Sequence, residues 1–182
     1  TATATGGSQN SASINSALPT LHGQFQYKNK NWLVGLGGEY KSLQPLTTSG
    51  RKISTEKVNS SLLMGYFKYS NDKFSVKGYG VSGQNMVNLV MLGGFAGYTT
   101  VGEPEKYEAI KTNAFWLDIA SNGKKIAPGL FFGYTKNGGV GKDNPTAYYG
   151  RGYSGTRGID NIMRVSGRVD FKHNKFRISP EL

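Results

Sequence analysis

The stretch YFKYSNDKFSVKGYG, residues 66–80, decides the fold. Before its polar run SNDK, Phe67 and Tyr69 fall on one parity and a lysine on the other. After the run, Phe74 and Val76 alternate with polar residues in the same way. Alternation with a period of two on both sides of a polar turn is typical of two antiparallel strands joined in a hairpin. The stretch therefore predicts a β-hairpin with one apolar and one polar face.

Three other segments repeat this pattern, so we expect hairpins over about residues 18–43, 58–84, 112–136 and 161–182. No segment shows convincing helical periodicity, and the sequence predicts an all-β fold of eight antiparallel strands. In three of the hairpins, two aromatic residues spaced by five flank a turn that carries lysine. These aromatic residues are Tyr27 and Trp32, Tyr69 and Phe74, and Phe171 and Phe176.

Composition narrows the class of protein. The 182 residues include 26 glycines and no cysteine, and the mean hydropathy is −0.44. No apolar run approaches the roughly 18 residues that a membrane-spanning helix needs. A transmembrane β-barrel escapes this test, because its polar lumen-facing residues cancel its lipid-facing ones in any average. The net charge of +11 is spread along the strands, which suits nucleic acid, an anionic surface or small anionic solutes as partners.

Loop lengths favour the membrane barrel. Long connections, at about residues 45–57, 85–111 and 137–161, alternate with the short turns, and outer-membrane barrels have this asymmetry. The six aromatic residues beside the turns would form the interfacial girdle of such a barrel. We expect the apolar parity to face lipid or a neighbouring subunit. Its members include Phe25, Val34, Phe67, Val76, Phe132, Val165 and Ile178.

Two other functions remain open. A soluble antiparallel β-barrel that binds a ligand alternates equally well, because one sequence does not show which way a face points. A membrane-barrel hydrolase would need a Ser/His/Asp constellation with His22 or His173 as its base. Solubility without detergent would favour the soluble barrel, and conductance steps in a planar bilayer would favour a channel.

Motifs for other chemistry are incomplete. GYGVSG and GRGYSG match a dinucleotide-binding spacing, but no plausible helix follows to hold a pyrophosphate. GGVGKD lacks the first glycine and the Ser/Thr of a phosphate-binding loop. His22 and His173 are far apart and, with no cysteine, make a poor metal site. We therefore expect no cofactor, no metal and no enzymatic activity. Basic and aromatic residues mostly take opposite parities, which disfavours a nucleic-acid groove.

The polar parity carries the candidate site. Guanidinium groups stay charged and match carboxylate or phosphate, so a row of basic residues along an aqueous wall would concentrate small anions. Alternatively, the arginines only pair with acids and make a neutral wall. The candidates for anion contact are Arg164, Arg168, Arg177, Lys68, Lys77 and Lys172. Their candidate acidic partners are Glu39, Asp118, Asp170 and Glu181.

Residues 86–98 are too apolar for a free loop. This segment, within NMVNLVMLGGFAGYTT, includes Met86, Val87, Leu92 and Phe95 as well as Met91. Large exposed apolar patches usually mark interfaces. We expect the segment to fold into the barrel or to pack at a subunit contact, the alternative being a longer strand.

Several segments in order resemble one family. WLVGLGGEYKSLQP, NLVMLGG, GLFFGYTKNGG, and YGRG followed by IDNIMRVSGRVDF are similar to the second half of DcaP-like outer-membrane porins. The resemblance covers most of residues 20–182. It implies homotrimers of roughly 16-stranded barrels in the bacterial outer membrane, which pass small, often anionic, solutes. With short turns on the periplasmic side, both ends of the chain would lie outside. We therefore expect residues 1–182 to form a single partial β-barrel domain, about eight strands of a larger barrel.

Overall fold

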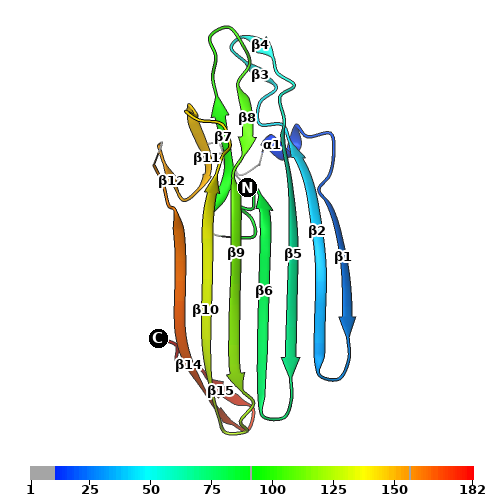
Figure 1. Cartoon of the computed structure of the whole chain (residues 1–182), viewed down its shortest axis with the longest axis vertical. Coiled ribbons are helices and arrows are strands. Elements are labelled where there is room, and N and C mark those ends of the chain that lie inside the picture. Colours follow the sequence, from blue (N-terminus) through cyan, green and yellow to red (C-terminus); the bar gives the residue numbers. More distant parts are fainter. Residues whose placement is uncertain (1–10, 91, 156) are drawn as a thin grey trace.

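The computed structural model describes residues 11–90, 92–155 and 157–182, and an eight-stranded antiparallel sheet dominates it (Figure 1). The all-β expectation is therefore confirmed. The hydrogen-bonded order is β1-β2-β5-β6-β9-β10-β14-β15, so neighbours in the sheet are also successive long strands along the chain. The strands are β1 (Leu21–Lys28), β2 (Trp32–Leu43), β5 (Val58–Ser70), β6 (Phe74–Gln84), β9 (Lys111–Ser121), β10 (Ile126–Gly139), β14 (Asn161–His173) and β15 (Phe176–Ile178).

Short turns lie at one end of the sheet and long connections at the other (Figure 1). The turn after β5 is closed by one side chain, because Asn71 Oδ1 accepts hydrogen bonds from the backbone N–H groups of Lys73 at 2.8 Å and Phe74 at 2.9 Å. Asn29 does the same for the backbone of Trp32 at 2.8 Å in the turn after β1. An asparagine that satisfies nearby backbone donors favours a tight turn over continued strand.

The long connections contain structure that alternation did not predict. The N-terminal segment forms one helical turn, α1 (Ser11–Ile14), which is too short to show a helical period. Three small sheets cover the same end of the molecule. Their strands are β3 (Thr48–Ser49) with β4 (Lys52–Ile53), β11 (Ala147–Arg151) with β7 (Gly93–Tyr98) and β8 (Lys106–Ala109), and β12 (Tyr153–Ser154) with β13 (Arg157–Gly158).

We call the three-stranded sheet β11-β7-β8 the loop subdomain, and a buried carboxylate organises it. Glu105 accepts hydrogen bonds from the hydroxyls of Tyr149 at 2.9 Å and Tyr107 at 3.1 Å. Phe95 stacks on Tyr149, with ring centres 5.2 Å apart. Burial and the neighbouring carboxylate disfavour the phenolates, so the pKa of Tyr149 rises to about 12 and the pKa of Tyr107 is also raised.

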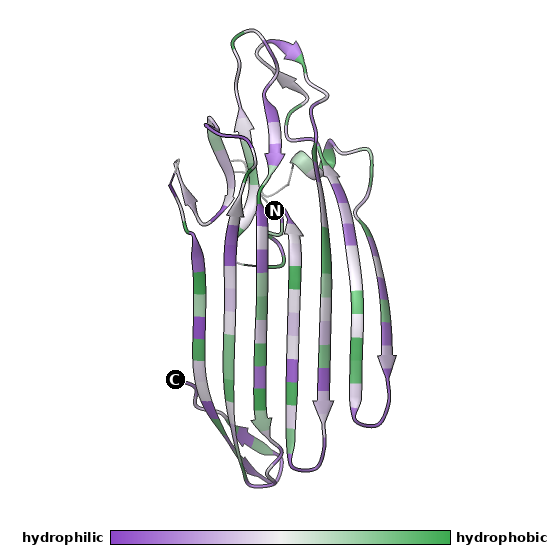
Figure 2. Ribbon diagram, in the orientation of Figure 1, coloured by the Kyte–Doolittle hydropathy of each residue, from purple (hydrophilic) through white to green (hydrophobic). Residues whose placement is uncertain are grey.

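The two faces of the large sheet differ sharply in chemistry, and the strand register defines them. Paired residues of antiparallel strands point to the same side of the sheet. Val34 is paired with Phe67, and Phe132 with Val165, on what we call the apolar face. Lys77 is paired with Asp118 on the other side, which we call the charged face. Figure 2 shows the resulting alternation of hydrophilic and hydrophobic residues along the strands.

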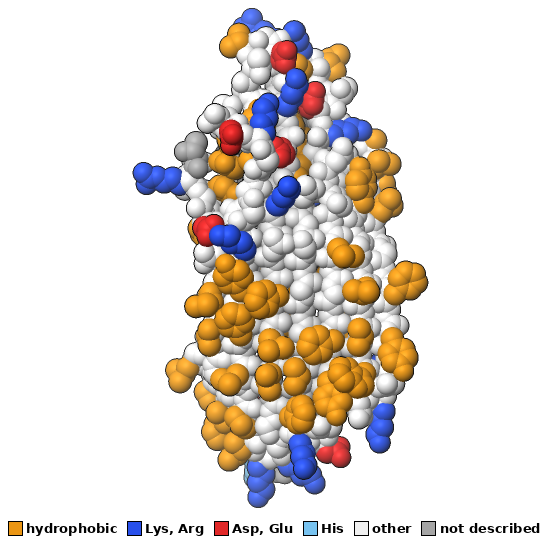
Figure 3. All heavy atoms as spheres, in the orientation of Figure 1, with side chains coloured by type: hydrophobic (Ala, Val, Ile, Leu, Met, Phe, Trp, Pro, Cys, Tyr) orange, Lys and Arg blue, Asp and Glu red, His pale blue; other side chains and the backbone are white. Residues whose placement is uncertain are grey.

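Apolar side chains gather in a band across the part of the sheet nearest the short turns (Figure 3). Phe25 is 87% exposed and Val165 is 64% exposed, so these are not core residues in the described chain. Toward the long connections the same parity becomes polar, at Asn59, Ser82 and Asn113. The alternation therefore predicted the apolar band. The band ends where the residues on this parity change from apolar to polar. Within the described residues, no helix is long and apolar enough to cross a membrane.

Candidate functional site: the charged face of the sheet

The ten basic and acidic residues singled out in the sequence all lie on the charged face. Lys68 is paired with Lys77, which is paired in turn with Asp118 on the next strand. Arg177 on β15 is paired with Lys172 on β14. The large sheet brings these side chains into one continuous wall, although the first and the last of the ten, Glu39 and Glu181, are 142 positions apart in the sequence.

The central contact of this wall is a bidentate ion pair that crosses a strand. Arg168 on β14 donates from Nη1 to Asp118 Oδ2 at 2.6 Å and from Nη2 to Asp118 Oδ1 at 3.1 Å. Gly129 lies between them on β10, and a Cβ there would be 3.0 Å from the guanidinium carbon of Arg168. Glycine thus leaves room for the arginine to reach across β10. Lys77 Nζ approaches the same carboxylate at 3.9 Å.

Two further arginines are also paired. Arg164 Nη2 donates to Glu181 Oε1 at 2.6 Å, and Ser166 Oγ donates to the same oxygen at 2.7 Å. Arg177 Nη2 donates to Asp170, whose other oxygen accepts from a serine hydroxyl. The arginines of the wall are therefore neutralised locally, as the alternative reading of the sequence expected of them.

The lysines leave the wall basic overall. Lys68 is exposed, and its side chain makes no hydrogen bond or ion pair with any residue that the structure describes. The Lys172 ammonium donates to a backbone carbonyl, that of Gly123 at 3.1 Å, and pairs with no carboxylate among the described residues. Basic residues outnumber acidic ones on this face of the strands. They are Lys28, Lys41, Lys68, Lys77, Arg164, Arg168, Lys172 and Arg177, against Glu39, Asp118, Asp170 and Glu181.

Aromatic residues also lie side by side on the charged face, and the sequence analysis did not predict this row. Tyr66, Tyr79 and Trp116 are paired in one row across three strands. Phe131 extends the row, and its ring lies over Gly133, where a Cβ would be 3.0 Å away. Ring centres are 6.1 Å apart for Tyr79 and Trp116 and 6.0 Å apart for Trp116 and Phe131. The sequence signal that could have revealed these aromatic residues is the parity that they share with Lys77 and Asp118.

The apolar segment after β6 folds onto the charged face. Met86 is fully buried against Leu62 and Val81, which both belong to that face. Lys41 Nζ fastens the segment by donating to the backbone carbonyl of Asn85 at 2.5 Å and to Asn88 Oδ1 at 3.1 Å. The expected burial is confirmed for Met86, Val87, Leu92, Phe95 and Ala96, whereas Leu89 is exposed and Met91 lies outside the described residues.

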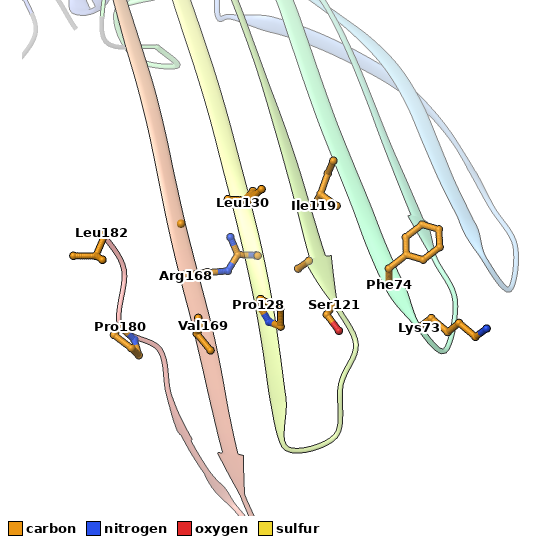
Figure 4. A pocket seen from close by; sticks show the side chains of 13 residues that line it. Lys73, Phe74, Ile119, Ser121, Pro128, Leu130, Arg168, Val169, Pro180 and Leu182 are labelled. Carbon is orange, nitrogen blue, oxygen red and sulfur yellow. The ribbon is translucent and has the colours of Figure 1, made fainter.

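The six predicted girdle residues lie beside the short turns on the apolar face. Trp32 and Tyr69 have ring centres 4.7 Å apart, and Tyr69 and Phe74 are 5.7 Å apart. Tyr27, Phe171 and Phe176 are exposed. An open groove of about 840 Å³ lies nearby (Figure 4). Its side chains include Phe74, Ile119, Pro128, Leu130, Val169 and Leu182, so its chemistry suits hydrocarbon.

The two histidines lie apart, as their sequence positions suggested. His22 is on the charged face, with Nδ1 4.0 Å from Glu39. His173 ends β14 beside the last turn, on the apolar parity. In the part of the chain that the structure describes, no three His, Asp or Glu residues form a group that could hold a metal ion.

Comparison of the chain with protein family models, with curated proteins and with solved structures gave no match.

Proposed function

We propose that the eight-stranded sheet is part of the wall of a transmembrane β-barrel in a bacterial outer membrane. The protein would be a passive diffusion channel for small solutes with a preference for anions. Its charged face would line the lumen, and its apolar face would contact lipid or the other subunits of a homotrimer. The DcaP-like porins that the sequence resembles are built in this way.

The observation that carries the proposal is the exposed apolar band. Removing apolar surface from water is favourable by roughly 25 cal/mol per Å², so a continuous band of exposed Phe, Leu, Val and Met requires a covering. Lipid-facing barrel walls carry an apolar band flanked by aromatic residues at both interfaces, and here the edge nearest the short turns carries such residues. A soluble barrel would instead turn this face inward, yet the buried clusters of this chain lie under the loops.

The apolar segment after β6, which we call the inward-folded segment, favours a channel over a soluble ligand-binding barrel. Residues 85–90 and 92 cover the charged face near the long connections and leave the Arg164–Glu181 pair exposed. In a closed barrel, a segment on the lumen wall narrows the aqueous path and brings solutes close to the wall charges. The excess of basic over acidic residues on this wall, which includes the exposed Lys68, then favours anions.

Reconstitution of the intact protein into a planar bilayer tests this function. We expect discrete conductance steps and, under a KCl gradient, a reversal potential of the sign that marks anion preference. Outer-membrane protein extracted and reconstituted in parallel from cells lacking the protein serves as the control. An intact protein that stays dispersed without detergent and adds no conductance would contradict the proposal and favour the soluble ligand-binding barrel.

A further inference from the structure

The aromatic row ends at a cavity on the charged face. The cavity has a volume of about 310 Å³ and is lined by Phe131, Arg164, Arg168 and Glu181. This volume is at the lower limit for small-molecule sites, and one sugar-sized ring fits it. The guanidinium carbon of Arg164 is 5.7 Å from the centre of the Phe131 ring. One aromatic ring and one ion pair therefore line the same small space.

Charge in this cavity is compensated. Arg164 is paired with Glu181, and Arg168 is held by both oxygens of Asp118. An anion entering here would have to compete with carboxylates that already occupy the arginines. A neutral polar ligand avoids that competition, because it need not separate either pair.

The unused hydrogen-bond donors and acceptors of the cavity suit hydroxyl groups. Both hydrogen bonds that Glu181 accepts from described residues use Oε1, which leaves Oε2 as an acceptor. Each guanidinium has five N–H donors, of which Arg164 uses one toward Glu181. A hydroxyl group both donates and accepts, so vicinal hydroxyls can bridge these unused donors and acceptors.

The aromatic rings require an apolar surface on the same ligand. Aromatic faces carry partial negative charge and attract the positive edges of C–H bonds. Trp116 and Tyr79 continue this surface from Phe131 along the sheet, and Tyr66 ends it between the side chains of Gln24 and Gln26, both hydrogen-bonded to its hydroxyl. A ligand with C–H faces and hydroxyl edges is a pyranose.

We propose that the cavity between Phe131, Arg164 and Glu181 binds the pyranose ring of a saccharide, and that Trp116 and Tyr79 extend this site along the charged face. A role in permeation rests on the proposed channel. Binding itself does not, because all these residues lie within the described part of the chain.

Fluorescence of the detergent-solubilised intact protein tests binding without reference to transport. Trp32 and Trp116 are the tryptophans of residues 1–182, so Trp32→Phe leaves Trp116, which lies in the proposed site, as the reporter within these residues. We expect maltotriose to change this fluorescence with saturation, and sorbitol, which has hydroxyls but no ring, to leave it unchanged. Phe131→Ala should weaken maltotriose binding at least ten-fold. Phe115→Ala, the matched control on the apolar face beside Trp116, should leave it within two-fold.

Bilayer recordings supply the second arm. Maltotriose should interrupt the open-channel current of the unmodified protein, and Trp116→Ala should weaken this block at least ten-fold with little change in conductance. Maltotriose binding without any conductance would overturn the channel and keep the saccharide site. Conductance with no maltotriose response in either assay, or a response to benzoate alone, would overturn the saccharide site and keep the channel.

Discussion

A single asparagine shapes each of the first two turns, and its contribution can be measured at Asn71. Asn71→Ala removes the acceptor for two backbone N–H groups, those of Lys73 and Phe74. We expect a loss of about 1 kcal/mol in the free energy of unfolding, because each bond contributes roughly 0.5–1.5 kcal/mol net and water replaces part of it. Urea unfolding in lipid vesicles measures this, and Asp72→Ala in the same turn should change little.

Orientation of the faces can also be tested at one residue. Val165 is exposed on the apolar face at the level of the band. Val165→Arg should cost about 2–4 kcal/mol of stability in a bilayer, because the charge enters hydrocarbon. His22→Arg introduces the same side chain on the charged face beside Glu39 and should be tolerated. Equal stability of both variants in vesicles would show that the apolar face does not contact lipid.

Residue parity could be predicted from the sequence, but side-chain partners could not. Alternation placed Arg168 and Asp118 on polar parities correctly. Their pairing depends on the register of three strands and on the missing side chain of Gly129, neither of which alternation encodes. Trp116 was missed for a related reason. Its neighbour Phe115 fits the apolar parity. A pattern of apolar residues therefore does not show that Trp116, the next residue, lies on the charged face.

At the scale of elements, Lys41 holds the inward-folded segment to β2. Lys41→Met keeps most of the side-chain volume but leaves the carbonyl of Asn85 without its charged donor. We expect a cost of about 1–3 kcal/mol in the free energy of unfolding, faster amide hydrogen exchange across residues 85–90, and a larger unit conductance. Lys68→Met removes a lysine without a partner in the described chain and should leave exchange unchanged. Unchanged exchange in Lys41→Met would show that packing of Met86 alone fixes the segment.

The loop subdomain should weaken in alkali. The pKa of Tyr149 is about 12 in the folded protein, above the ordinary value of 10.0, because burial and Glu105 disfavour the phenolate. A raised pKa contributes stability that is complete below the ordinary value and is lost as the pH rises through about 12. Protease cleavage in residues 93–109 should therefore increase over this range. Tyr149→Phe should reduce that increase, while Tyr27→Phe on exposed β1 should not.

The positions of the strands were predictable where apolar and polar residues alternate with a period of two along the whole segment. The long strands have one apolar face and one polar face, so their alternation is visible in the sequence. The strands of the loop subdomain are not alternating, since β7 is buried at every residue. Its pairing with β11 joins segments about fifty residues apart, and nothing local specifies that contact.

At the scale of the whole molecule, the anion selectivity of the proposed channel can be tested by removing lysines, so that the ion pairs of the arginines stay intact. Lys68→Gln with Lys77→Gln removes positive charge and leaves the Arg168–Asp118 pair in place. We expect the anion-to-cation permeability ratio to fall by about two-fold, since charge-lined clefts change local ion concentration by roughly ten-fold or more. Reversal potentials under a KCl gradient measure the ratio. Lys30→Gln in the first turn is the control, and an equal shift there would place selectivity outside the charged face.

The large sheet has two edge strands, β1 and β15. Among the described residues, β1 is bonded to β2 along one side only, and β15 to β14 along one side only. No proline interrupts β1, so its outer row of backbone groups is a template on which a further strand can add. Whatever strand occupies that border, whether from elsewhere in this polypeptide or from another copy, continues the ladder at about 4.8 Å spacing. In the larger barrel that we propose, assembly would add a strand at each of these two edges, and incorrect strand pairing would begin there.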